Sequence, residues 1–182
     1  VCKVEYHAFY ECDNLCDIYY GGHATDWLSA ADSDVVFPSN TTIHYKDEIL
    51  GKGNCGANIE WLLSADGVLT ISGVGAMYDY SYGEDLPSWY KLSGRIYKVV
   101  INLGVSNIGS NMFENCKNLK SIMIPSSVTS IGYDAFFGCV SLSDVYYGGD
   151  EGNWATISIT KVGNQPLENV YVWFASCGEG SI

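Results

Sequence analysis

Cysteines, histidines and paired carboxylates are the side chains with which this chain could perform metal or nucleophilic chemistry. It has 7 cysteines, an odd number, so they cannot all form disulfides within the chain. A zinc site would be indicated by a Cys-x-x-Cys pair, which the sequence lacks, and His7, His23 and His44 are scattered. We therefore predict no metal site and no cofactor.

Catalysis by a nucleophile would need a Ser or Cys beside a base, with a carboxylate that orients the base. No local motif has this pattern. Glu84-Asp85 and Asp150-Glu151 could hold calcium or act on glycosides, but no Asp-x-Asp-x-Asp-Gly loop accompanies them. We interpret both pairs as solvated loop charges, His7 as an exposed residue and His44 as a packing residue. The chain is predicted not to be an enzyme.

Three of the cysteines belong to copies of one short pattern. Cys116 and Cys139 are 23 residues apart (139 − 116), which lies in the range of leucine-rich repeats. Such repeats stack, and the cysteines at this position are expected to be small buried thiols, although a bridge between Cys116 and Cys139 is also possible. The copies are Ala8-Phe9-Tyr10-Glu11-Cys12-x-x-Leu15, Met112-Phe113-Glu114-Asn115-Cys116-x-x-Leu119 and Ala135-Phe136-Phe137-Gly138-Cys139-x-x-Leu142.

A longer match links the two ends of the chain. The pattern Cys-x-x-Leu-x-Asp-Ile/Val-Tyr-Tyr-Gly-Gly-x4-Trp occurs from Cys12 to Trp27 and again from Cys139 to Trp154. Residues 40–44 then align with 169–173, which leaves two extra residues in the later loop, near Gly163-Asn164-Gln165-Pro166. The amino-terminal segment is therefore an internal copy of the carboxy-terminal one.

Each repeat is expected to add one strand, called a rung here, with the pattern Leu-x-x-Ile-x-Ile. Alternate side chains of a strand point to opposite faces, so every rung has an inward and an outward set. The turns between rungs should be irregular or short-helical. The predicted inward residues are Ile96, Val99 and Ile101; Leu119, Ile122 and Ile124; Leu142, Val145 and Tyr147; and Leu167, Val170 and Val172.

The outward residues of the rungs are the candidate binding residues, because repeat proteins use this face as an extended binding surface. Tyrosine suits such a surface, since it adds apolar area with a polar tip at little entropic cost. Alternatively, the aromatic residues only pack against one another across the strands. One predicted column contains Val100, Met123, Tyr146 and Tyr171, and the next contains Lys98, Ser121, Asp144 and Asn169.

Four segments follow from these patterns. Residues 1–45 hold two rungs, residues 96–174 hold four, and residues 175–182 form a tail. In residues 46–95, Ala65-Asp66-Gly67 separates two β-rich runs, 59–63 and 68–71, and predicts a β-hairpin. Because the end units of repeat stacks need a cap, we expect this hairpin to cover the rung at Ile96, with Trp89 packed inward. The predicted fold is a β-rich α/β solenoid of leucine-rich repeats of about 23 residues with a β-hairpin cap.

The composition of the chain limits the classes of partner that it can bind. The chain has 182 residues, is 47% apolar and carries a net charge of −12, so it should fold and should repel nucleic acid and anionic membrane surfaces. No apolar run is long enough to span a bilayer. The start, without Met and without a signal-peptide pattern, leads us to expect a mature or excised piece of a larger protein.

One repeat, residues 122–142, contains a long and specific motif: Ile122-Met123-Ile124-Pro125-Ser126-Ser127-Val128-Thr129-Ser130-Ile131-Gly132-Tyr133-Asp134-Ala135-Phe136-x-x-Cys139-x-x-Leu142. This string closely resembles the BspA-like leucine-rich repeat of secreted and surface-anchored bacterial proteins and of some protist surface proteins. The segment from Gly53 to Met77 also looks like one that often precedes such repeats. The resemblance implies an extracellular or cell-surface location, adhesion or ligand binding, and no enzyme.

We therefore expect a non-catalytic binding or adhesion module whose partner is a protein or glycan of a host or neighbouring cell. Two alternatives stay open: a structural spacer in a larger surface protein, and a non-catalytic module attached to a secreted enzyme. A ligand bound on the outward face of the rungs would separate the first reading from the spacer.

Overall fold

The computed structural model of this chain describes residues 8–9, 12, 14–20, 22, 27, 35, 38, 41–45, 48–81 and 85–175. It divides into two compact units. Unit 1 comprises Val1–Leu50 with Ser64–Asp66, and unit 2 comprises Gly51–Leu63 with Gly67–Ile182. Our interpretations of His7, His23 and Glu84 lie outside the described residues, as does all but the first residue of the predicted tail.

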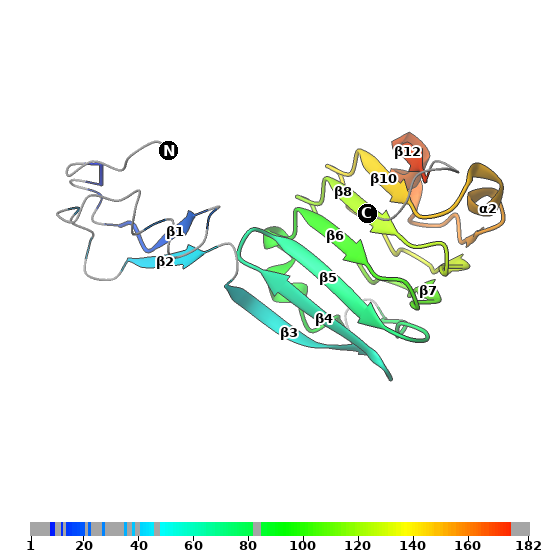
Figure 1. The fold of residues 1–182 in the computed structure, drawn as a ribbon, viewed down its shortest axis with the longest axis horizontal. Helices are drawn as coiled ribbons and strands as arrows, with labels where there is room; N and C mark the ends of the chain where they lie inside the picture. The colour runs from blue at the N-terminus through cyan, green and yellow to red at the C-terminus, as the bar shows by residue number, and fades with distance from the viewer. Residues whose placement is uncertain are drawn as a thin grey trace. The chain divides into compact units, whose positions relative to one another are not determined.

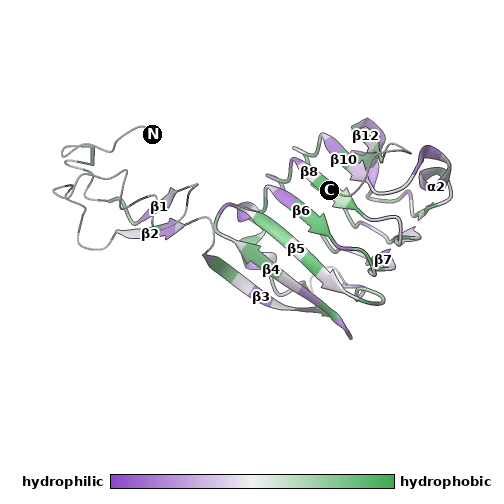
Figure 2. Cartoon of the chain, viewed as in Figure 1, coloured by the Kyte–Doolittle hydropathy of each residue, from purple (hydrophilic) through white to green (hydrophobic). Residues whose placement is uncertain are grey.

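The main sheet is open and has the strand order β12-β10-β8-β6-β5-β4-β3 (Figure 1). The strands from β5 to β12 pair in parallel, whereas β4 and β5 are antiparallel. Hydrophobic residues are concentrated along β5, β6 and β8 (Figure 2). The bounds are β3 (Ile49–Gly56), β4 (Ile59–Ser64), β5 (Val68–Gly73), β6 (Lys98–Ile101), β8 (Ser121–Ile124), β10 (Asp144–Tyr147) and β12 (Tyr171–Phe174).

The first three predicted rungs are confirmed. Val99 pairs with Ile122, and Ile122 pairs with Val145. All nine side chains predicted to point inward from these rungs are buried. The alternation of apolar and polar residues produces this result, because only one face of each strand can contact the core.

Aromatic rings extend the core beneath the sheet. Trp89, predicted to pack inward, is 1% exposed and stacks on Phe113, with ring centroids 6.2 Å apart. Phe113 in turn lies 5.4 Å from Phe136, and Trp61 meets Trp89 edge to face at 5.3 Å. These rings come from the hairpin, from the segment after it and from the turns of two repeats, so they join the cap to the repeats.

The predicted hairpin is confirmed and lies beside the first rung, where Leu69 of β5 pairs with Val99 of β6. The hairpin turn contains Gly67 at φ +80°, a conformation that favours glycine. The strand β3 extends the sheet past the hairpin, which the sequence patterns did not predict.

The fourth rung corrects our prediction. In β12, Val172 pairs with Val145 and Phe174 pairs with Tyr147, so the strand runs two residues later than the predicted inward set of Leu167, Val170 and Val172. The reason is the 3₁₀ turn η2 (Gln165–Asn169), which has Pro166 in its first turn and uses the two extra residues of this loop. Asn169 therefore belongs to a turn and not to a strand.

The turns between rungs also differ from our expectation of irregular or short-helical structure. Short parallel strands, β7 (Asn107–Ile108), β9 (Ser130–Ile131) and β11 (Ser158–Ile159), form a second sheet. The described helical segments are η1 (Tyr90–Arg95), η2 and α2 (Glu151–Ala155). Asp150 is exposed and caps α2 by accepting a hydrogen bond from the Asn153 backbone N–H at 2.7 Å.

Unit 1 contains the two rungs that the sequence predicts. β1 (Asp17–Tyr20) pairs in parallel with β2 (Thr42–Tyr45), and Ile18 lies opposite Ile43. The cysteines of the repeat pattern differ between the units. Cys116 and Cys139 are buried, as predicted, but Cys12 is exposed, which corrects our prediction of a third buried thiol. All three are free thiols.

Candidate functional site

The candidate site lies on the strand face of unit 2, which is the face of the main sheet opposite the core. Cross-strand pairing places one row of uncharged side chains across six strands, which we call the central row. Its members are partly or well exposed, and Tyr146 and Trp173 are exposed by 43% and 54%. The central row consists of Leu62, Thr70, Val100, Met123, Tyr146 and Trp173.

A second row lies beside it, and we call it the polar row. It consists of Lys98, Ser121, Asp144 and Tyr171. Seven of the eight predicted face residues thus lie on the strand face. Tyr171 lies in the polar row, opposite Asp144, and not in the row of Tyr146, while Asn169 is off the strand face.

Sequence reasoning missed Trp173 as a face residue because it assigned the fourth rung the wrong register. A signal was present: residues 40–44 align with 169–173, so His44 corresponds to Trp173. The structure confirms this alignment, since His44 lies opposite Tyr19 as Trp173 lies opposite Tyr146.

Tyr146, Trp173 and Asp144 form a fixed group, which we call the ring site. The two rings are nearly parallel, at 15°, with centroids 6.3 Å apart. The Trp173 indole N–H donates to Asp144 Oδ1 at 2.9 Å, and the Ser143 hydroxyl donates to Asp144 Oδ2 at 2.6 Å. These bonds, first from Ser143 and then from Trp173, lower the pKa of the Asp144 carboxyl. The carboxylate thus stays charged and holds the indole in place.

An apolar hollow of about 300 Å³ adjoins the ring site. Its lining includes Met123, Pro125, Tyr146, Trp173 and Phe174. Concave, mostly apolar surfaces with a few fixed polar groups are typical of ligand sites.

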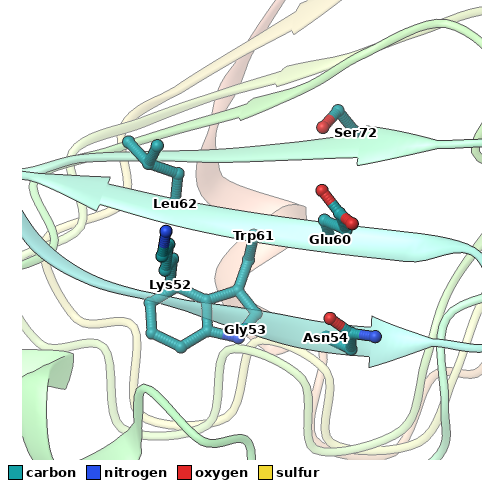
Figure 3. A pocket seen from close by; sticks show the side chains of 7 residues that line it. All are labelled: Lys52, Gly53, Asn54, Glu60, Trp61, Leu62 and Ser72. Atoms are coloured by element: carbon teal, nitrogen blue, oxygen red, sulfur yellow. The ribbon is translucent and has the colours of Figure 1, made fainter.

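A second hollow, of about 460 Å³, lies over β3, β4 and β5. Figure 3 shows Lys52 and Asn54 of β3 and Glu60 and Leu62 of β4 around it, with the Trp61 ring lying across Gly53. A Cβ atom at Gly53 would be 2.9 Å from the Trp61 ring nitrogen, so the glycine makes room for the indole. The strand face thus has a hollow with charged and amide side chains toward one end of the sheet and an aromatic hollow toward the other.

Metal and membrane features were sought in the part of the chain that the structure describes. Within it, three or more His, Cys, Asp or Glu side chains do not gather into a group that could hold a metal ion. Among the same residues, the helices are too short or too polar to cross a membrane.

Comparisons with known proteins bear on the same region. Residues 88–164 match the family model of the BspA type leucine-rich repeat region, in 6 copies. A leucine-rich repeat protein from Eubacterium ventriosum is 33% identical, with 68% of this chain and 27% of that chain covered and a TM-score of 0.49. A leucine rich cell surface protein from Faecalibacterium prausnitzii is 16% identical, with 79% and 51% covered and a TM-score of 0.28. No curated protein matches the chain. The chain spans about a quarter and about half of the two matched proteins.

Proposed function

Because residues 88–164 form a BspA-type leucine-rich repeat region, we propose that this chain is a non-catalytic binding module of a secreted or cell-surface protein. Its repeats stack as a solenoid, and the strand face of unit 2 binds a protein or glycan of another cell. The observation that carries this proposal is the central row, which ends in the exposed Tyr146 and Trp173 rings.

The arrangement of the strand face supports binding. A row of uncharged side chains crosses six strands, with charged groups beside it at Lys98 and Asp144. Aromatic anchors flanked by polar groups are characteristic of recognition surfaces. The net charge of −12 favours neutral or basic partners over anionic ones.

Binding should be measured by biolayer interferometry with the immobilised chain against a panel of neutral and charged oligosaccharides and purified extracellular glycoproteins. We expect Trp173→Ala and Tyr146→Ala to weaken binding at least tenfold, which corresponds to about 1.4 kcal/mol. Tyr133→Ala is the matched control, because Tyr133 is 47% exposed but lies in a turn after β9. Equal binding by all three variants would contradict the proposal.

A structural spacer is the second candidate, and the stacking of Tyr146 on Trp173 favours it. If these rings only stabilise the last rung, Trp173→Ala should lower the melting temperature and change no binding. The binding proposal expects the reverse: a nearly unchanged melting temperature, because each side chain is about half exposed, together with lost binding.

A further inference from the structure

Unit 1 contains a ring pair that matches the ring pair of unit 2. Tyr19 lies opposite His44 on β1 and β2, as Tyr146 lies opposite Trp173 on β10 and β12. The Tyr19 and His44 rings stack at 9° with centroids 4.4 Å apart. Tyr19 is 42% exposed, close to the 43% of Tyr146. His44, interpreted from sequence as a packing residue, stacks on Tyr19 with its side chain 13% exposed, and it occupies the position that Trp173 has in unit 2.

The carboxylate of the ring site is repeated as well. Asp17 Oδ1 lies 2.8 Å from His44 Nε2, as Asp144 Oδ1 lies 2.9 Å from Trp173 Nε1. One difference distinguishes the copies: the other imidazole nitrogen, Nδ1, lies 2.8 Å from Glu48 Oε2. The ring of unit 1 is held between two carboxylates, and the ring of unit 2 by one.

The support behind each ring pair is also the same. Tyr20 packs edge to face on Trp27 with centroids 5.1 Å apart at 67°, and Tyr147 packs on Trp154 at 5.3 Å and 62°. The repeat between the units therefore extends from the sequence to the geometry of the strands, the rings and their supports.

The size of the shared surface limits its ligand. It consists of three side chains on two four-residue strands, an area of roughly 13 by 10 Å from the usual strand dimensions. A stable protein interface covers about 800 Å² on each partner, several times more than this surface. A ligand that both copies can hold is therefore small.

The chemistry of the shared surface limits the ligand further. The ring that a ligand can reach differs between the units: Trp173 is 54% exposed in unit 2, whereas in unit 1 the His44 side chain is 13% exposed and the accessible ring is Tyr19, at 42%. Each flat ring has a carboxylate beside it that can accept hydrogen bonds and repels anions. A flat apolar face with acceptors at its rim complements a neutral sugar, whose C–H groups pack on the ring while its hydroxyls donate.

We propose that unit 1 carries a second ring site, formed by Asp17, Tyr19 and His44, that each site binds one neutral sugar residue, and that only the site of unit 1 depends on pH. This inference rests on the proposed function of the strand face. It assigns the chain two separate sugar sites and names the ligand class.

The pH dependence follows from the number of N–H groups on each ring. A protonated imidazole donates from both nitrogens, to Asp17 and to Glu48, whereas a neutral imidazole has one N–H and must turn a lone pair toward one carboxylate. Hydrogen bonding to Asp17 raises the pKa of His44, and contact with Glu48 adds to this against the lowering by burial. Among the residues that the structure describes, Asp17 and Glu48 are the charged groups in contact with the ring. The indole of Trp173 keeps its N–H at every pH.

The test is an NMR titration of the full chain with maltohexaose, mannopentaose and N-acetyllactosamine as neutral probes. The reporters are the Trp173 indole N–H, identified by its loss in Trp173→Phe, and the His44 imidazole C–H, identified by its loss in His44→Ala. At about pH 5.5, below the raised pKa of His44, we expect at least one probe to shift both reporters. At a pH above the midpoint at which the His44 C–H reporter itself titrates, we expect the same probe to shift the Trp173 reporter alone.

His44→Trp is the matched variant, because it gives unit 1 the ring of unit 2. We expect it to bind the probe in both units at both pH values. A response of Trp173 alone at both pH values in the native chain would overturn the second site and leave the proposed function intact. No response to any of the three probes at about pH 5.5 would overturn the sugar assignment. Equal binding by Trp173→Ala, Tyr146→Ala and Tyr133→Ala in the interferometry experiment would overturn the proposed function itself.

Discussion

The thiol of Cys139 donates a hydrogen bond to the backbone carbonyl of Phe113, at 3.1 Å. Both residues are buried, and Phe113 belongs to the preceding repeat. Burial raises the pKa of the Cys139 thiol to about 12, so the group stays neutral and acts as a donor. The contact links two repeats through a side chain and the main chain.

This contact predicts different effects for two equivalent cysteines. Cys139→Ser leaves a hydroxyl that can donate to the Phe113 carbonyl, so we expect the free energy of unfolding to fall by about 1 kcal/mol or less. Cys116→Ser buries a hydroxyl at a site 1% exposed, and we expect a loss of about 1 to 3 kcal/mol. Urea unfolding followed by circular dichroism measures both. Equal losses would mean that the Cys139 contact contributes nothing.

We predict a larger loss of stability when Asn164 is replaced. Its side chain is 2% exposed, accepts a bond from the Phe136 N–H at 3.0 Å and donates to the carbonyls of Gly132 and Thr160 at 2.7 and 2.6 Å. Asn164→Ala leaves these backbone groups unpaired, so we expect a loss of about 2 to 5 kcal/mol.

Asn153→Ala is the control for this change, since Asn153 is exposed and completes the cap of α2. We expect this variant to lose about 1 kcal/mol or less, a shift in melting temperature of a few degrees at most. Differential scanning calorimetry compares the two variants. A smaller loss at Asn164 than at Asn153 would contradict the role of the buried amide.

Gly67 predicts a loss caused by both backbone strain and crowding. Its φ is +80°, and a Cβ atom there would lie 2.6 Å from the carbonyl oxygen of Arg95. Gly75 has φ +119°, but a Cβ atom built on Gly75 would lie in open space, so Gly75→Ala measures backbone strain without crowding. We expect Gly67→Ala to lose about 1 to 3 kcal/mol more than Gly75→Ala in thermal unfolding. A smaller difference would show that the hairpin turn can shift.

The raised pKa of Glu114 leads us to predict that the stability of the fold depends on pH. Burial, followed by the charge of Asp134, raises the pKa of its carboxyl. A carboxyl whose folded pKa is raised stabilises the fold fully below its unfolded pKa, and this contribution is lost as the pH rises through the folded pKa. Glu114→Gln stays neutral, so we expect it to match the native chain at about pH 4 and to be more stable at about pH 7.5.

Urea unfolding of Glu114→Gln at the two pH values tests this sign. Glu60→Gln, at an exposed position, controls for the removal of one negative charge from an acidic chain. If both variants gain the same stability at the higher pH, the effect comes from net charge and not from the burial of Glu114.

The sequence by itself determined the first three rungs, the hairpin and the internal repeat. These features depend on local signals: alternation with a period of two, an Asp-Gly turn, and the recurrence of the segment from Cys12 to Trp27 at Cys139 to Trp154. The inward positions recur in each rung, so the register assigned to one strand supports the register assigned to the next.

The tertiary structure alone decided the composition of the ring site, and it settled the register of the fourth rung, for which the Leu-x-x-Ile-x-Ile pattern and the alignment of residues 40–44 with 169–173 gave different answers. Two extra residues can enter a turn or lengthen a strand, and only pairing with β10 places them in η2 and brings Trp173 to Asp144. The same reason applies to β7, β9 and β11, since a two-residue strand carries no recognisable pattern and is held by its neighbours. Contacts between repeats, and not local sequence, thus decided which side chains meet on the strand face.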